Sequence, residues 1–176
     1  MRVIAGEFRS RILKSLPGLD TRPTPDRLRE TLFNVLASEI QGKLFLDGYA
    51  GTGAVGIEAL SRGAGSAIFI ERSRPAVLLI RENLKSLKAE ARAEVLQGKT
   101  LHFLAQRTAD IVFLDPPYEL EKEYGEALAI AGAGVSPLII VQHSARLQLQ
   151  ERYGNLERKR LLKQGDNSLT FYRAGI

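Results

Sequence analysis

Four consecutive residues, Asp115-Pro116-Pro117-Tyr118, follow the apolar stretch 111–114. The two prolines fix φ and remove two backbone donors, so the turn should be rigid and its carbonyl groups should be free to accept hydrogen bonds. A carboxylate, accepting carbonyls and an aromatic ring together suit a flat base that carries an amino group. We expect Asp115 and the Pro116 carbonyl to accept the two amine hydrogens. The Tyr118 ring would stack on the base, a contact worth roughly 1–3 kcal/mol.

A second segment that could take part in binding or catalysis is glycine-rich and covers residues 47–56. Glycines let a backbone turn tightly and approach a ligand closely. Gly51, Gly53 and Gly56 match the G-x-G-x-x-G spacing of dinucleotide-binding loops, and Glu71 follows Gly51 by twenty residues. A carboxylate at that distance accepts hydrogen bonds from ribose hydroxyls, so the segment predicts a nucleoside-containing cofactor.

Asp47 distinguishes between two nucleoside-containing cofactors, a dinucleotide and S-adenosylmethionine. It stands where a diphosphate would approach, and its charge would repel a dinucleotide but attract the ammonium and sulfonium of S-adenosylmethionine. An NAD-dependent dehydrogenase is the weaker interpretation, because no pair of His, Lys or Tyr suggests a hydride-transfer partner. With the sulfonium as the reactive group, the protein would act mainly by alignment for in-line displacement.

The elements that must position these residues alternate along the chain. Short apolar runs at 44–47, 67–71, 93–97, 110–115 and 136–142 predict strands. Helical patterns cover 53–62, 75–88, 100–106 and 119–131. Residues 155–174 read as two antiparallel strands joined around Gly165-Asp166-Asn167. We therefore predict an α/β fold whose mostly parallel, seven-stranded sheet has helices on both faces and a C-terminal antiparallel hairpin.

Ligands of such sheets bind at the carboxyl ends of the strands. Asp47, Glu71, Gln97 and Asp115 stand at these ends and should share one rim. We expect a single domain, 1–176, with its catalytic core at 41–176. Residues 1–40 would add a hairpin at 2–16 and a helix introduced by Thr24-Pro25, with Thr24 as its N-cap.

The amino-acid composition excludes several kinds of catalytic and metal site. The chain has no cysteine, which excludes disulfides, thiolate metal sites and cysteine nucleophiles, and with them C5 methylation of pyrimidines. With only two histidines, a metal site is not expected. Charges break every long apolar stretch and no signal peptide is apparent, so we expect a cytoplasmic protein without a membrane partner.

The formal net charge of +5 is unevenly distributed. Residues 1–29 hold seven basic side chains against three acidic ones, and a second basic group, Arg158, Lys159, Arg160 and Lys163, lies near the C-terminus. Such clusters suit a polyanion, although a solvated surface has the same composition. The candidate RNA contacts are Arg2, Arg9, Arg11, Arg22, Thr24 and Arg27.

These motifs resemble those of Rossmann-like class I methyltransferases, and more narrowly the bacterial 16S rRNA guanine-N2-methyltransferases of the RsmD type. The similarity rests on Arg22-Pro23-Thr24, on residues 26–34, on 47–53, on Glu58-Ala59-Leu60-Ser61-Arg62-Gly63-Ala64 and on 115–118. It implies methylation of a guanine N2 amine in ribosomal RNA or a small-subunit assembly particle, by a protein expected to be a monomer. The implied cofactor residues are Asp47, Gly48, Tyr49, Gly51, Gly53, Glu71, Arg72, Gln97 and Gly98.

Two departures from the family pattern concern the cofactor. Gly48 stands where the family usually has a bulky apolar residue, and Gln97-Gly98-Lys99 replaces a segment that often offers an acid to adenine. Backbone groups of Gly98 could supply that contact. Two other functions remain open: an adenine-N6 methyltransferase, which shares the Asp-Pro-Pro-Tyr logic, and an inactive RNA-binding module on the same fold.

Overall fold

The computed structural model describes residues 1–17, 24–134 and 137–175. Its α-helices are α1 (Asp26–Leu36), α2 (Ala54–Ser61), α3 (Arg74–Ser86), α4 (Thr100–Leu104) and α5 (Glu121–Ala133), with a 3₁₀ turn η1 (Glu90–Arg92). Its strands are β1 (Leu44–Asp47), β2 (Ser66–Glu71), β3 (Ala93–Gln97), β4 (Ile111–Leu114), β5 (Leu138–Ser144), β6 (Arg152–Tyr153), β7 (Leu156–Gln164) and β8 (Asn167–Ala174).

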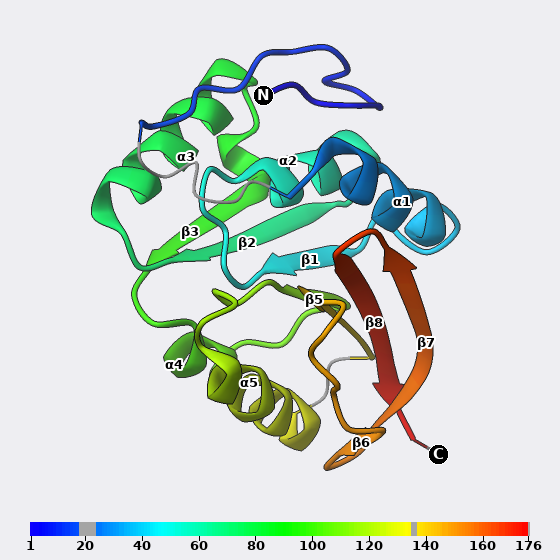
Figure 1. Cartoon of the computed structure of the whole chain (residues 1–176). Coiled ribbons are helices and arrows are strands. Elements are labelled where there is room, and N and C mark those ends of the chain that lie inside the picture. The colour runs from blue at the N-terminus through cyan, green and yellow to red at the C-terminus, as the bar shows by residue number, and fades with distance from the viewer. Residues whose placement is uncertain (18–23, 135–136, 176) are drawn as a thin grey trace.

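The strands form one sheet in the order β3-β2-β1-β4-β5-β8-β7-β6 (Figure 1). The first five are parallel and the last three antiparallel, which confirms the predicted α/β class and the C-terminal hairpin. The sheet has eight strands rather than seven, because Arg152–Tyr153 pairs with the beginning of β7. Two residues are too few to produce a recognisable strand pattern in a sequence.

The centre of the sheet creates the place for a ligand. β1 lies between β2 and β4, so the chain leaves β1 for one neighbour and returns later to the other. At such a reversal of strand order the connections diverge and leave a crevice at the carboxyl ends of the strands. β4 is buried along its whole length, which explains its unbroken run of apolar residues.

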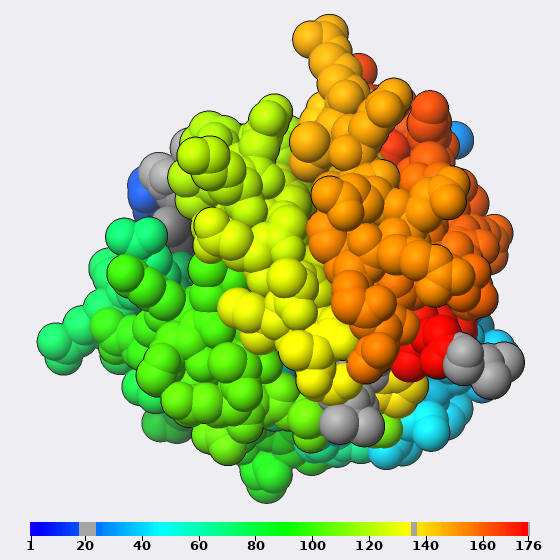
Figure 2. Space-filling view, turned by 90° about the horizontal axis from the view of Figure 1, so that it is seen from below, coloured from blue at the N-terminus to red at the C-terminus, as the bar shows by residue number. Residues whose placement is uncertain are grey.

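Helices cover both faces of the parallel strands. α1, α2 and α3 lie on one face, and α4 and α5 on the other (Figure 1). On the α5 face, Leu114 and Val141 of the sheet belong to one buried cluster with Leu128 of α5 and Tyr172 of β8. Figure 2 looks onto this side, where α5 (yellow) adjoins the orange segment that includes β6 and β7.

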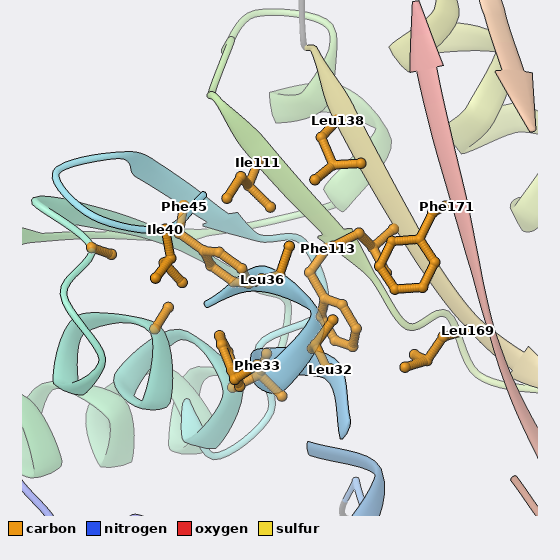
Figure 3. Close-up of a cluster of buried hydrophobic side chains, with 14 of the residues drawn as sticks. Leu32, Phe33, Leu36, Ile40, Phe45, Ile111, Phe113, Leu138, Leu169 and Phe171 are labelled. Atoms are coloured by element: carbon orange, nitrogen blue, oxygen red, sulfur yellow. The ribbon is translucent and has the colours of Figure 1, made fainter. Parts of the chain in front are cut away.

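On the opposite face, α1 packs directly on the sheet (Figure 3). Its residues Leu32, Phe33 and Leu36 share a buried cluster with Phe45 of β1 and Phe113 of β4. The Phe45 ring centroid lies 5.9 Å from that of Phe33 and 6.5 Å from that of Phe113. This packing fixes β1 and β4 against each other, and both strands end at the candidate site.

Two local predictions at the N-terminus were wrong in detail. Pro25, rather than Thr24, is the N-cap of α1, and it offers no side-chain hydrogen bond. Residues 2–12 form a turn-rich loop closed by one antiparallel bridge, Arg2 to Ile12, instead of two extended strands. Gly6 and Ser10 have positive φ in this loop, which breaks the extended conformation that strand pairing needs.

Candidate active site

Acidic side chains meet at the carboxyl ends of the central strands. Asp47 ends β1, Glu71 ends β2, and Asp115 directly follows β4. Burial raises the pKa of Asp47 to about 7; the Gly56 amide opposes this rise, and the charges of Asp115 and Glu71 add to it. Negative charge is thus concentrated at this rim.

Only one of the two oxygens of the Asp47 carboxylate takes part in a hydrogen bond that stabilises the fold. Its Oδ2 accepts a hydrogen bond from the Gly56 amide in the first turn of α2, at 3.1 Å. Its Oδ1 is buried and accepts no hydrogen bond of normal geometry in the part of the chain that the structure describes; the Tyr49 amide only slightly opposes the rise in the Asp47 pKa. A buried acceptor without a donor is costly, and an ammonium group placed against it would remove that cost. The residues present therefore fit the amino-acid end of S-adenosylmethionine.

The glycine loop joins β1 to α2. Gly53 is the N-cap of α2 with φ of +85°, a left-handed conformation that glycine adopts without strain. The Gly51 amide donates to Glu71 Oε2 at 2.7 Å, which ties the loop to β2. A Cβ at Gly51 would meet nothing within 4 Å, so the backbone there borders open space. The loop can therefore approach a ligand closely.

Glu71 is held rigidly in a partly exposed position. Besides the Gly51 amide, it accepts hydrogen bonds from the amides of Arg72 and Ser73, both at 2.9 Å. These donors orient the carboxylate at the beginning of α3, beside the glycine loop. From this position it can accept further hydrogen bonds from vicinal hydroxyls such as those of a ribose.

Gly48 and Tyr49 serve the packing around the loop. A Cβ at Gly48 would lie 2.8 Å from Leu114 Cδ2, and this close contact explains why a bulky residue is absent here. The Tyr49 ring packs against the α5-face cluster, and its hydroxyl donates to Glu123 Oε1 at 2.9 Å. Burial, followed by the Glu123 carboxylate, raises the pKa of Tyr49. Tyr49 thus connects the loop to α5.

The predicted adenine contacts are less complete. The side chains of Gln97 and Arg72 are exposed at the edge of the rim. The Gly98 amide, which we expected to be available to adenine, already donates to the Glu71 carbonyl at 3.0 Å. Of the backbone groups of Gly98, its carbonyl therefore remains the candidate.

The Asp-Pro-Pro-Tyr turn is supported from two sides. Asp115 is partly buried and Pro116 is buried. The buried Tyr124 hydroxyl of α5 donates to the Pro116 carbonyl at 2.9 Å, and the Tyr118 hydroxyl donates to Asn167 Oδ1 at the beginning of β8. The expectation that the Pro116 carbonyl is free was thus wrong: α5 packs under the turn and uses one of its two lone pairs.

Pro117 is exposed, and its carbonyl accepts the Leu120 amide at 3.0 Å, which closes the turn before α5. Sequence reasoning missed both Tyr124 and Asn167. Neither residue belongs to a local pattern with the prolines, because they lie eight and forty-nine residues from their partners.

The basic candidates at the N-terminus divide into two groups. Arg2 donates to the Ser10 carbonyl and Arg11 to the Ser86 carbonyl, so both contribute to the fold. Arg9 and Arg27 are exposed, and their guanidinium groups form no hydrogen bond or ion pair with the described residues. Thr24 is partly buried, and Arg22 lies outside the described residues.

Glu58 and Ser61 of α2 hold the N-terminal loop in place. The sequence had indicated these two residues only as part of a motif similar to that of the family. Glu58, fully buried, accepts hydrogen bonds from the amides of Ile4 and Ala5 at 2.8 and 3.1 Å. Ser61 Oγ accepts the Phe8 amide at 2.9 Å and donates to the Ala5 carbonyl at 2.6 Å. The helix that begins at the glycine loop is therefore also the platform for the N-terminus.

Among the described residues, no group of three or more acidic or histidine side chains is arranged to hold a metal ion. Among the helices in the same ranges, none has the length and apolar character needed to cross a bilayer.

The fold and its acidic rim define a class I, Rossmann-like methyltransferase. The chain superposes on the solved structure named "Putative methyltransferase yhhF from Escherichia coli" with a TM-score of 0.85 and 36% identity, covering 99% of this chain and 98% of that one. The helices, the parallel sheet and the C-terminal hairpin are all included in this coverage.

The family model described as "Conserved hypothetical protein 95" matches residues 1–173, and the chain belongs to this family. It is 34% identical to YlbH of Bacillus subtilis over 181 residues, 98% of each protein. It is 47% identical over 122 residues to "Ribosomal RNA small subunit methyltransferase D" of Escherichia coli, which covers 67% of this chain and 60% of that protein. These relatives place the family among the RsmD-type methyltransferases.

Proposed function

We propose that this protein transfers a methyl group from S-adenosylmethionine to the exocyclic N2 amine of a guanine in 16S ribosomal RNA. The observation that carries the proposal is the meeting of Asp47, Glu71 and Asp115 on one rim, where one oxygen of the buried Asp47 has no hydrogen-bond partner among the described residues. One rim thus combines a site for a cationic nucleoside with an acceptor for an amine.

Asp47, Glu71 and Asp115 would have different roles in the reaction, which follow from their positions on the rim. The cofactor is S-adenosylmethionine, whose sulfonium supplies the electrophilic methyl group. Asp47 holds its ammonium, and Glu71 accepts hydrogen bonds from its ribose. Asp115 accepts an N–H of the guanine amine, which turns the nitrogen lone pair toward the cofactor and excludes unproductive orientations. As the N–C bond forms, the bond between the methyl group and the sulfonium would break and leave a neutral thioether, and the amine would then lose its proton to Asp115 or to water.

The RNA part of the proposal rests on the relatives and on charge. The Escherichia coli relative is named for the small ribosomal subunit, and Arg9 and Arg27 are exposed cations beside the docked N-terminus. We propose that residues 1–40 grip the RNA and that 41–176 carry the chemistry. A monomer suffices, because Asp47, Glu71 and Asp115 all come from one chain. Cytoplasmic location follows from a ribosomal substrate.

Incubation with isotope-labelled cofactor and total RNA or DNA, followed by mass spectrometry of the nucleosides, tests the proposal. N2-methylguanosine from small-subunit RNA is the expected product. N6-methyladenine in RNA or DNA would replace the guanine assignment by the adenine alternative. RNA binding without any methylated nucleoside would favour an inactive RNA-binding module.

Asp115→Ala should abolish methyl transfer while cofactor affinity is retained, because Asp115 faces the amine and Asp47 holds the cofactor. Asp166→Ala, which removes an exposed acid from the β7–β8 turn, is the matched control and should keep full turnover. Unchanged turnover in Asp115→Ala, measured by label incorporation, would refute the assigned role.

A further inference from the structure

A pocket of about 520 Å³ opens on the α5 side of the Asp-Pro-Pro-Tyr turn. One wall consists of Tyr118, Glu121 and Tyr124, and the other of Ser144, Arg146 and Leu147. The pocket therefore lies where the beginning of α5 meets the segment that follows β5. Figure 2 shows the surfaces of these two segments, yellow and orange, in contact on this face.

The pocket is distinct from the place where cofactor and amine meet. None of Asp47, Glu71 or Asp115 lines it, whereas Tyr118 does. Because Tyr118 follows Asp115 by three residues in the same turn, the pocket lies beside the candidate amine site. A base stacked on Tyr118 beside Asp115 would have its strand neighbour within reach of this second pocket.

Its walls are fixed before any ligand arrives. The Leu147 amide donates to the Ser144 carbonyl at 3.0 Å, and the Arg146 amide donates to Ser144 Oγ at 3.2 Å. The Ala145 amide donates to the Asp166 carbonyl at 2.9 Å, which ties this segment to the β7–β8 turn. The opposite wall is held by the Tyr124 hydroxyl on the Pro116 carbonyl.

The lining has the chemistry of a nucleotide site. Arg146 is exposed, and within the described ranges no carboxylate pairs with its guanidinium. An unpaired guanidinium is a strong phosphate ligand. The Tyr118 ring and the Leu147 side chain offer apolar contact to a base, and the Glu121 carboxylate can accept a hydrogen bond from a ribose hydroxyl or a base N–H.

A second exposed cation, Lys163, lies on the surface beyond the pocket. Lys163 of β7 is exposed and pairs in register with Ser168 of β8, which in turn pairs with His143 of β5, next to Ser144. It forms no ion pair with the described residues, in contrast to Arg158 and Lys159, which contact Glu151 and Glu157. A polyanion leaving the pocket would thus meet Lys163.

We propose that this pocket binds the nucleotide adjacent to the methylated guanine, with Arg146 on the intervening phosphate. The inference rests on the proposed function, since it requires an RNA strand that passes the active site. Holding the neighbour on the far side of Tyr118 fixes the register of the extruded guanine against Asp115. Arg146 is thereby a positioning residue that does not touch the reacting atoms.

The test compares Arg146→Ala with Arg81→Ala, which removes another exposed arginine from α3, on the opposite face of the sheet. The substrate is an RNA fragment in which the methylated guanosine has been mapped with wild-type protein. Arg146→Ala should raise the KM for this RNA about tenfold with kcat and cofactor affinity retained. The slope of log affinity against log salt should fall by about 0.7, the value for one phosphate contact in a single strand.

A chemical substitution identifies the contact. A methylphosphonate at the phosphate next to the target should weaken wild-type binding as much as Arg146→Ala does, and should not weaken the variant further. Equal KM and salt slope in Arg146→Ala and Arg81→Ala would overturn the pocket assignment while the proposed function stands. Loss of cofactor affinity in Arg146→Ala would also overturn it. Failure of the wild-type protein to methylate any RNA would instead reject the proposed function.

Discussion

Asp47 serves both the fold and the candidate cofactor site with one carboxylate. One oxygen caps the first turn of α2 and the other is buried with no donor in the described ranges, while Asp115 and Glu71 add negative charge nearby. The group therefore has a pKa of about 7, well above the ordinary value of 3.8. Its protonation state changes within the physiological range, which makes cofactor binding sensitive to pH.

We predict that S-adenosylmethionine binds about tenfold more weakly at pH 6 than at pH 8, because the ammonium needs the ionised carboxylate. The free protein shows the opposite trend. Its folded state binds the Asp47 proton more tightly than the unfolded state, so stability decreases as pH rises from about 4 to 7. Calorimetric titration at both pH values and urea unfolding measure these effects. Asp47→Asn should bind weakly with no such pH dependence; a flat wild-type profile contradicts the assignment.

Tyr124 is the support of the Pro116 carbonyl. Tyr124→Phe removes a buried hydrogen bond and should lower the unfolding free energy by about 1 kcal/mol. The turn that carries Asp115 loses one of its two supports, so kcat should fall while cofactor affinity is retained. Tyr172→Phe is the control, because its buried hydroxyl donates to the Gln150 carbonyl at 2.7 Å, away from Asp115. Equal rates of single-turnover methylation in the two variants would show that Tyr124 contributes to stability but does not position Asp115.

At the scale of elements, α2 joins two parts of the candidate site. It begins at the glycine loop, and its last turn holds the N-terminal loop through Glu58 and Ser61. Gly6 makes the closest approach: a Cβ there would lie 1.9 Å from the Ser61 carbonyl oxygen. A side chain at position 6 is therefore incompatible with docking.

Gly6→Ala should release the N-terminal loop from α2, expose the hydrogen-bonding groups of Glu58 and weaken RNA binding. Gly42→Ala is the matched control, because Gly42 also has a positive φ, +72°, but a Cβ there meets nothing within 4 Å. The control should cost about 1–2 kcal/mol from backbone strain alone, and Gly6→Ala should cost more. Urea midpoints measure the difference, and equal midpoints would show that the contact with Ser61 yields easily.

The elements themselves were largely predictable because their signals are local. The runs 44–47 and 93–97 became strands with those bounds, since apolar residues between polar ends leave little choice. The contacts that complete the site were not predictable. Tyr124, Asn167 and Glu58 look like ordinary polar residues, and only the packing of α5, β8 and the N-terminus assigns them partners.

The N-terminal segment was the weakest part of the prediction for a related reason. The loose apolar alternation of residues 2–16 suggested strands, but Val3, Phe8 and Leu13 are buried in one cluster with α2 and α3 residues. That cluster needs a compact loop rather than two extended strands. Tertiary packing therefore decided the conformation where the local pattern was ambiguous.

For the molecule as a whole, the charge distribution predicts how RNA is held. The exposed cations without partners among the described residues include Arg9 and Arg27 on the N-terminal side and Arg146 and Lys163 on the C-terminal side. These two groups come from opposite ends of the sequence. A strand that crosses the rim could contact both of them.

The double variant Arg9→Ala/Arg27→Ala should weaken RNA binding and lower the salt slope by up to about 1.4, the value for two phosphate contacts in a single strand. Cofactor affinity should not change. Arg81→Ala combined with Lys85→Ala removes the same charge from α3 and serves as the control. Filter binding over a range of salt concentrations measures the slope, and equal slopes in both double variants would assign the N-terminal arginines to ordinary solvation.

The place of β8 in the sheet has a consequence for biosynthesis. β8 is synthesised after β5 and β7 but inserts between them, and its first residue, Asn167, receives the Tyr118 hydroxyl. A nascent chain could therefore complete the parallel strands, and with them Asp47 and Glu71, while the proline turn still lacks one of its supports. Chains interrupted before residue 167 should therefore transfer no methyl group, because activity requires the synthesis and insertion of β8.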